Sequence, residues 1–288
     1  MPTAMYKHAY LIIAHTDFHQ LLQLVKQLDD VRNDIYIHID RKASFDGEEI
    51  QTSKAGLYIL PQRLDARWGD FSLVEVEYLL FEAAFSQDNY SYYHLLSGVD
   101  LAIRSQDDIH HYCEQHAGTE FIGFAQKVPS QELHWRSQHY FLFAKDFHST
   151  SLWKRGLRAA FVYLQDLVHY RRSKWEVKKG AQWCSVTCDF VRYLLAHRVE
   201  IYKAFHHTYC PDELFIQTLC WNSPFKERIN INQDEFEGCK RYIPWKDGHL
   251  LPITVDDVEL MMQSDKWFAR KFSSQQPEVI EALLNKIQ

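Results

Sequence analysis

The strongest constraint on the fold is a short apolar segment near the start of the chain. Residues 9–14 read Ala-Tyr-Leu-Ile-Ile-Ala and carry no charged side chain. A strand that is buried on both faces of a parallel sheet has such a continuous run, whereas a half-exposed strand alternates apolar and polar residues. The segment therefore predicts a central strand of a parallel sheet.

The residues that follow complete a strand–helix–strand unit. Thr16 or Asp17 can cap a helix, and apolar side chains at helical spacing follow over residues 18–28. Residues 35–39 then alternate as a second strand, which ends at Asp40. Because parallel strands need a crossover connection, this order predicts a right-handed βαβ unit.

Further strands and helices alternate along the chain. We expect strands at residues 57–60, 92–96 and 120–124, and helices at 71–85, 106–116, 153–170 and 187–205. Such alternation is typical of an α/β domain with a mostly parallel, Rossmann-like sheet flanked by helices. No repeat or flexible linker divides the chain, so we expect residues 1–288 to form a single domain.

Composition excludes several functional classes. The formal net charge of -6 argues against a nucleic-acid partner. The six cysteines form no C-x-x-C pair, which favours reduced thiols. No secretory signal opens the chain and its apolar runs are too short to span a bilayer, so a cytoplasmic protein, peripheral on the inner face of the membrane or fully soluble, is expected.

Polar residues follow several of the expected strands. His15 comes after the first strand, Asp40 after the second, and the loop at residues 97–100 after the strand at 92–96. Ligands in open α/β sheets bind beyond the carboxyl ends of the strands. Each residue also has an ordinary interpretation as a loop residue, turn former or chain reversal. Their coincidence at one rim favours a nucleotide pocket.

A second group of residues combines a carboxylate with two cations. Pro211, Asp212 and Glu213 open an apolar, helical run, where acids complement the helix dipole. Glu213 is also a candidate general base, and cations follow at Arg241 and Lys271. One carboxylate and two cations would suit transfer of a sugar from a nucleotide diphosphate without a metal.

Taken in order, these segments resemble glycosyltransferase family 14, the core-2/I-branching β-1,6-N-acetylglucosaminyltransferases and peptide-O-xylosyltransferases with their bacterial relatives. The resemblance runs from about residue 10 to residue 272. It rests on segments in the family's order: 11–15, 37–42, 63–74, 93–105, 180–183, Pro211–Glu213, Arg241 and 268–272. The animal members' membrane anchor and luminal cysteine pattern have no counterpart here, which leaves the acceptor open.

The resemblance implies a GT-A-type fold and inverting transfer from a UDP-sugar without a metal or other cofactor. Glu213 then takes the place of the catalytic base, and Arg241 and Lys271 take the places of the cations that hold the diphosphate. The remaining donor-binding positions are His15, Asp40, Arg67, Trp68 and Asp100. The acceptor-binding positions are Trp135, Arg136, Gln182 and Trp183.

These implications give a specific functional hypothesis. Residues 1 to about 125 would bind the nucleotide sugar, and residues from about 126 to 288 would bind the acceptor and catalyse transfer. The sugar, N-acetylglucosamine in the first instance, would go to a glycan or lipid-linked glycan in cell-surface polysaccharide or lipooligosaccharide synthesis. A catalytically silent UDP-sugar- or glycan-binding protein, and a metal-dependent transferase that uses Asp100, are the alternatives.

The basic region at residues 154–179 suggests one further partner. Its lysines and arginines surround an amphipathic helix in an otherwise acidic protein. This pattern suits contact with an anionic membrane surface, and it also suits an ordinary solvated face.

Overall fold

The structure is a computed structural model that describes residues 7–147, 150–168, 173–230, 235–246 and 249–287. Its centre is a six-stranded sheet with the strand order β3-β2-β1-β4-β7-β6. The strands are β1 (His8–Ala14), β2 (Asn33–Ile39), β3 (Gly56–Ile59), β4 (Tyr92–Ser97), β6 (Phe121–Ile122) and β7 (Cys184–Thr187). The pairs β3–β2, β2–β1 and β1–β4 are parallel, and β7 is antiparallel to β4 and β6. The expected α/β class with a mostly parallel sheet is confirmed.

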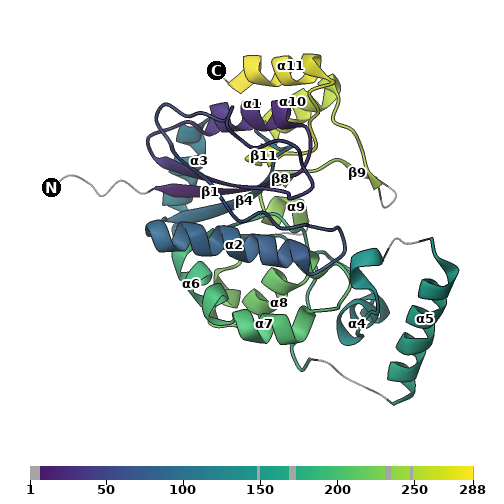
Figure 1. Ribbon diagram of the computed structural model, residues 1–288. Helices are drawn as coiled ribbons and strands as arrows, with labels where there is room; N and C mark the ends of the chain where they lie inside the picture. The colour runs from purple at the N-terminus through teal and green to yellow at the C-terminus, as the bar shows by residue number, and fades with distance from the viewer. Residues whose placement is uncertain (1–6, 148–149, 169–172, 231–234, 247–248, 288) are drawn as a thin grey trace.

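Side chains of β1 alternate between two hydrophobic cores. Ala9, Leu11 and Ile13 pack into the core on one face of the sheet, whereas Tyr10 and Ile12 pack into the core on the other. Helices cover both faces, which is why residues 9–14 of this strand are all apolar. Figure 1 shows α2, α6, α7 and α8 beneath the sheet and α1, α10 and α11 above it.

The helices and short helical turns can be given in chain order. They are α1 (Phe18–Leu28), α2 (Ser72–Gln87), α3 (Gln106–Gln115), α4 (Ser130–Gln138), η1 (Ala144–Asp146), α5 (Leu152–Leu167), α6 (Cys188–Ala196), α7 (Arg198–Phe205), η2 (Pro211–Glu213), α8 (Phe215–Trp221), η3 (Pro224–Arg228), α9 (Glu235–Gly238), α10 (Val255–Gln263) and α11 (Pro277–Ile287). Of the two expected caps for α1, Asp17 is the one whose side chain accepts a hydrogen bond, from the Gln20 backbone N–H.

A second, three-stranded sheet joins distant parts of the chain. It has the order β5-β11-β8, formed by Leu101–Ala102, Phe268–Ala269 and Arg241–Tyr242. A separate hairpin pairs β9 (Trp245–Lys246) with β10 (His249–Leu250). The small sheet places the segment of Arg241 directly beside the segment that leads to Lys271, since Phe268 is the register partner of Arg241.

Two expected elements differ from the structure. The single helix expected at 187–205 is two helices, because the chain turns at His197, whose Nδ1 bonds the Tyr193 carbonyl at 2.8 Å. The strand expected at 120–124 is limited to the two residues of β6. The helix expected at 153–170 is α5, and its last two residues lie outside the described ones.

The expected halves of the chain share one sheet. β7 comes from the second half and lies between β4 and β6 of the first half. All six cysteines are free, as expected. Among the described residues, every helix is too short or too polar to cross a bilayer.

Candidate active site

The carboxyl ends of the parallel strands form one rim, and the residues expected there lie along it. His15 follows β1, and it lines a pocket of about 670 Å³ together with Val99, Lys271 and Ser274. Two parts of the pocket wall that are 257 residues apart in sequence are hydrogen-bonded to each other, because the Ser274 backbone N–H donates to Asp17 at 2.8 Å. Partial burial and then the nearby Lys271 charge lower the pKa of His15.

Asp40 lies at the rim but is buried beneath it. Its carboxylate accepts hydrogen bonds from the backbone N–H groups of Lys42 (2.7 Å) and Ala66 (3.0 Å). The Lys42 ammonium is 3.2 Å away. The structure therefore gives Asp40 the role of holding the loop that follows β3, which differs from the expected direct contact with a nucleotide.

The loop held by Asp40 carries two further donor-binding candidates, Arg67 and Trp68. Arg67 pairs with Asp65 at 2.8 Å and lies 3.5 Å from Asp146. The Trp68 side chain is 56% exposed, and its ring meets that of Tyr209 edge-on at 5.8 Å. An exposed indole at this position offers a stacking surface for a base or a sugar.

Asp100 is buried beside the Arg270 guanidinium. One carboxylate oxygen accepts from the Ser97 backbone N–H at 3.0 Å, and the other lies 3.3 Å from Nε of Arg270. Burial raises the pKa of Asp100, and the Arg270 charge opposes that effect. An oxygen that faces a guanidinium is poorly placed to bind a cation, which disfavours the metal-dependent alternative.

Arg241 was expected to hold the diphosphate, and the structure places its side chain in the interior. Its guanidinium is buried and donates to the carbonyls of Cys239 (2.7 Å), Cys184 (2.8 Å) and Leu95 (3.3 Å) and to the Ser185 hydroxyl (3.2 Å). Burial lowers its pKa. Because β8 turns this side chain towards the central sheet, Arg241 supports the interior and does not face the pocket that Lys271 lines.

Arg270 was not among the site residues predicted from the sequence. Its side chain is 13% exposed, lies beside Asp100, and stacks over the Trp183 ring at 4.1 Å. It adjoins the exposed Lys271, whose pKa is lowered by partial burial and then by the Arg270 charge. The Arg-Lys pair in the sequence was a signal for two cations, but it does not show which of them faces inward.

Glu213 lies at the end of η2, just before α8. Pro211 occupies the first turn, after Cys210 in the left-handed backbone region (φ 46°). The Glu213 side chain is 33% exposed, and it accepts a hydrogen bond from Nη2 of Arg136 at 2.8 Å. A partly exposed carboxylate fixed by a guanidinium has the properties of a positioned general base.

Arg136 was expected to bind the acceptor, and the structure shows it paired with the candidate base. It is almost fully buried and also donates to the carbonyls of Cys210 (3.1 Å) and Tyr209 (3.4 Å). Nη1 lies 3.5 Å from Glu132, at the start of α4. Arg136 therefore links α4 to η2 and fixes the orientation of Glu213.

The backbone around Glu213 is closely packed. The Gly180 N–H donates to the Glu213 carbonyl at 3.0 Å, and a Cβ at Gly180 would lie 1.8 Å from the Gly123 carbonyl oxygen. Asp212 is buried with no hydrogen-bond partner for Oδ1 among the described residues. Burial and the Glu213 charge raise the pKa of Asp212 to about 7.

The other acceptor candidates divide into one surface residue and two interior ones. Trp135 is partly exposed, and its ring packs edge-on against Tyr209 at 5.5 Å. Gln182 donates to the buried Glu77 at 2.8 Å, and burial raises the pKa of Glu77 well above its usual value. Trp183 is buried beneath Arg270. Only Trp135 of these three presents a broad surface to an incoming molecule.

Two groups among the described residues could hold a metal. The first is buried and joins His8, His94 and Cys113, and the second joins His134, His139 and Asp166. In the first, His8 Nδ1 and His94 Nε2 lie 3.0 Å apart, which is the distance of an ordinary hydrogen bond. Neither group includes Glu213 or the residues of the pocket.

Comparison with known proteins identifies the family. The Core-2/I-Branching enzyme family model matches residues 8–266. Xylosyltransferase 2 of Canis lupus familiaris and of Homo sapiens are each 22% identical to this chain over 298 residues. Both alignments cover 96% of this chain and 33% of the relative, so the chain spans about a third of the length of these relatives.

A crystal structure of S. aureus TarS 1-349 shows a distant resemblance, with 10% identity, a TM-score of 0.38, and coverage of 97% of this chain and 71% of the other. That TM-score is too low to support a conclusion about this chain. The family model matches most of the sequence, and the matched residues include Glu213, Arg241 and the strands of the rim. The chain belongs to the Core-2/I-Branching enzyme family of glycosyltransferases.

Proposed function

We propose that this protein is an inverting, metal-independent glycosyltransferase that moves a sugar from a UDP-sugar to a hydroxyl of a glycan acceptor. N-Acetylglucosamine is the first donor sugar to test, as in the branching enzymes of the family. Xylose is the second, because the relatives are named xylosyltransferase 2. Membership of the family supports the reaction class, and the site supports the roles of individual residues.

One observation carries the proposal: a single loop links the strand rim to the candidate base. The Ala66 N–H is bound to Asp40 at the end of β2. Three residues later, the Gly69 carbonyl accepts from the Cys210 N–H at 3.1 Å. Arg136 then connects Cys210 to Glu213. This chain of contacts makes the rim and the base parts of one connected structure.

The proposed reaction is a direct displacement at the anomeric carbon. The acceptor hydroxyl oxygen bonds to that carbon as its proton passes to Glu213, and the carbon–oxygen bond to the diphosphate breaks with its electron pair leaving on UDP. Attack from the face opposite the leaving group inverts the configuration. Lys271, which is exposed at the pocket, meets the growing charge on the diphosphate.

The two alternatives make different predictions. A metal-dependent enzyme would need Asp100 as a ligand, and its ion pair with Arg270 favours the metal-free reaction. A silent binding protein would bind UDP-sugars without turnover. The Glu213 side chain is 33% exposed, so an acceptor hydroxyl can reach its carboxylate, as an enzyme of this kind requires.

We also propose that the acceptor is a glycan or a lipid-linked glycan, used in the cytoplasm at the inner face of the membrane. A product of cell-surface polysaccharide or lipooligosaccharide synthesis fits this setting. Trp68 and Trp135, whose rings both meet Tyr209, provide aromatic surface beside the base on which sugar rings can stack.

A turnover assay tests the proposal. UDP release should occur with at least one member of a UDP-sugar panel, and full activity should remain in EDTA. Glu213→Gln should lower turnover by about 100-fold or more while UDP binding persists. Glu132→Gln is the matched control, since Glu132 contacts the same Arg136 from the other side. Equal turnover in Glu213→Gln and wild type, or loss of activity in EDTA with rescue by Mn²⁺, would refute the mechanism.

A further inference from the structure

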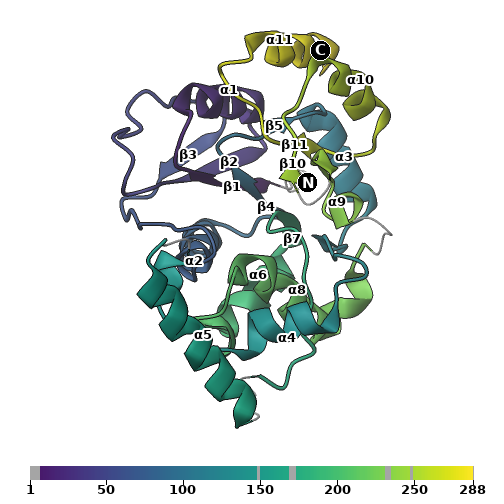
Figure 2. The ribbon, with the colours of Figure 1, turned by 90° about the vertical axis from the view of Figure 1, so that its right-hand side faces the viewer.

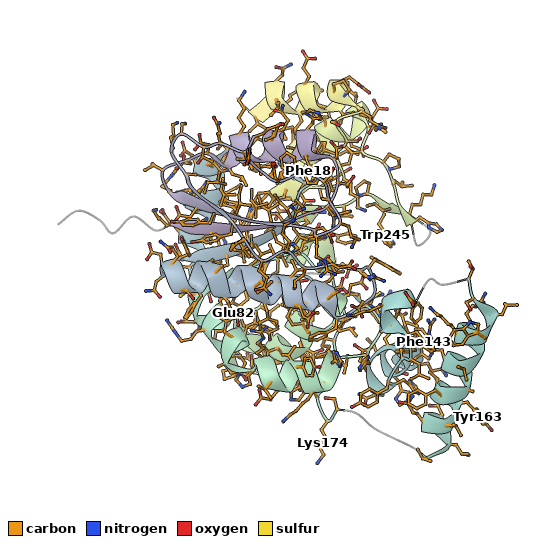
Figure 3. All side chains as sticks on the ribbon, viewed as in Figure 1. Phe18, Glu82, Phe143, Tyr163, Lys174 and Trp245 are labelled. Carbon is orange, nitrogen blue, oxygen red and sulfur yellow. The ribbon has the colours of Figure 1, made fainter. Side chains whose placement is uncertain are left out.

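The end of α4 and the last turn of α5 lie next to each other, away from the central sheet. Both ribbon views show the two helices as neighbours (Figures 1 and 2). Phe143, from the segment that connects them, packs against Trp153 near the start of α5, with ring centroids 5.5 Å apart (Figure 3). Near the other end of α5, Gln165 accepts from the Tyr140 N–H at 2.8 Å and donates to the Tyr140 carbonyl at 3.0 Å. These contacts fix the last turn of α5 against the residues that follow α4.

Three side chains with metal-binding atoms converge at this contact. The His139 Nε2 atom lies 2.8 Å from the Asp166 carboxylate, and a ring nitrogen of His134 completes a group whose ligand atoms are all within 4.8 Å of one another. Two residues five apart would point about 140° away from each other on a continuous helix. Because α4 ends at Gln138 and the backbone of His139 is extended, the two imidazole rings instead meet edge-on at 5.3 Å.

Both ring nitrogens of His139 face oxygen acceptors. Nδ1 lies 3.1 Å from the Trp135 carbonyl, and Nε2 faces the Asp166 carboxylate. A neutral imidazole has one N–H and can donate to only one of these oxygens. An N–H donated to a backbone carbonyl is the contact that metal-binding histidines usually make, because it fixes the tautomer and leaves the lone pair of the other nitrogen for the ion. Nε2 would then point its lone pair at a carboxylate, and a cation between them would remove that repulsion.

A plain ion pair with a protonated His139 is the alternative. It would place a charge on a side chain that is only 3% exposed, which is costly, and it would not use the His134 ring. A bound ion would instead lie on the solvent side, because His134 and Asp166 are both exposed, and it could enter from there. Ligand atoms of a tetrahedral zinc ion are about 3.4 Å apart for bonds of about 2.1 Å, so small rotations of the two exposed side chains would complete the geometry.

The other group of possible ligands, His8, His94 and Cys113, is a poorer cation site. The Ser185 hydroxyl lies 2.7 Å from Nδ1 of His94 and 3.2 Å from the Arg241 guanidinium, so a positive charge is one hydroxyl away. The three side chains are buried and include no carboxylate to offset a second positive charge.

We propose that His134, His139 and Asp166 bind a zinc ion, with water in the fourth position. Two imidazoles and one carboxylate suit Zn²⁺, whereas Mg²⁺ and Ca²⁺ prefer oxygen ligands alone. The ion would join the end of α4 to the last turn of α5 and stabilise this pair of helices. Its ligands include neither Glu213 nor Lys271, so it takes no part in the transfer step, and the inference does not rest on the proposed function.

Zinc titration of the full chain tests the proposal without any turnover measurement. Protein treated with EDTA and then freed of it should bind Zn²⁺ in calorimetric titration, and zinc at about a hundred times its Kd should raise Tm by about 5–10 °C. Asp166→Asn and His134→Ala should each weaken this binding by about a hundredfold or more, because even an outer hydrogen-bond partner contributes about 10- to 100-fold to metal affinity. Both side chains are exposed, so the fold should survive, which circular dichroism would verify.

Asp189→Asn and His111→Ala are the matched controls, and both should bind zinc as wild type does. Asp189 is an ion-paired carboxylate of similar exposure to Asp166, 58% against 55%, and His111 is an exposed histidine on α3. Absence of a zinc-induced rise in Tm would overturn the proposal, as would equal zinc affinity in wild type, Asp166→Asn and His134→Ala. With Co²⁺ in place of zinc, the absorption band of a cobalt–thiolate bond would assign the ion to the group with Cys113 and would also overturn it. UDP release does not enter these measurements, so a failure of the proposed reaction would leave them unaffected.

Discussion

Arg241 and Lys271 should respond to substitution in opposite ways, because only one of them is accessible. The Arg241 guanidinium supplies hydrogen bonds to three backbone carbonyls, those of Leu95, Cys184 and Cys239. Arg241→Met removes these donors and leaves buried acceptors unpaired. Each such loss costs about 1–3 kcal/mol, while removal of a buried charge returns part of that cost.

A net destabilisation of about 3 kcal/mol is therefore expected for Arg241→Met. At about 2–4 °C per kcal/mol for a chain of this size, Tm should fall by about 6–12 °C. Lys271→Ala should leave Tm almost unchanged, because Lys271 is exposed at the pocket. It should instead weaken UDP binding by about ten- to a hundred-fold with little effect on uridine, since a charge-assisted contact contributes about 1.5–3 kcal/mol.

Thermal unfolding followed by circular dichroism, and calorimetric titration with UDP and with uridine, separate these outcomes. Folded Arg241→Met should bind UDP within about threefold of wild type, which corresponds to less than 1 kcal/mol. The reasoning would be refuted by an Arg241→Met variant with wild-type Tm and greatly weakened UDP binding. That result would mean that the guanidinium turns towards the ligand, as the sequence resemblance implied.

Three other perturbations test the surroundings of Glu213. Gly180→Ala should lower kcat more than UDP affinity. A Cβ at residue 180 would lie 1.8 Å from the Gly123 carbonyl oxygen, so the backbone N–H that donates to the Glu213 carbonyl would be displaced. Gly156→Ala is the control, because the space around Gly156 is open. Arg136→Lys should lower kcat by about tenfold at unchanged UDP affinity, since a point charge cannot replace the guanidinium fork; wild-type kcat would exclude a positioning role. Asp212→Asn should change the pH dependence of stability. The pKa of Asp212 is raised from 3.8 to about 7 in the folded state, so its stabilising contribution is complete below pH 4 and is lost as pH rises to 7. Urea unfolding of Asp212→Asn should therefore show higher stability than wild type at pH 8 and a flatter profile between pH 4 and 7, and parallel profiles would contradict this assignment.

The sequence predicts the sheet and its rim well because both depend on local patterns. The apolar run at residues 9–14 is buried on both faces, and its continuity alone indicates that environment. The carboxyl ends of β1, β2 and β4 meet at one edge because parallel pairing requires it, so His15, Asp40 and the loop at 97–100 lie together. These predictions depended on the pattern of apolar residues and on parallel pairing, and not on the side-chain orientation of any single residue.

The roles of the cations could not be predicted in the same way. Arg241 lies in a strand of two residues, which is too short for alternation to show which side is buried. Arg136 and Glu213 are separated by 77 residues, and no local pattern joins them. A sequence motif can show that a cation is present at a position, but only the packing shows whether it serves a ligand, a carboxylate or backbone carbonyls.

Helix α5 shows the same limit at the scale of a whole element. Its apolar residues have clear helical spacing, and the helix expected there is present. The usual assumption places such a stripe against the core. The polar side of α5 packs inward instead, because Arg158 and Gln165 satisfy backbone groups of residues 140–147 that no regular element pairs. Buried polar groups must be hydrogen-bonded, and this requirement outweighs the burial of a few leucines when the neighbouring segment is irregular. The apolar stripe is thereby left at the surface, and periodicity alone could not distinguish this orientation from the usual one.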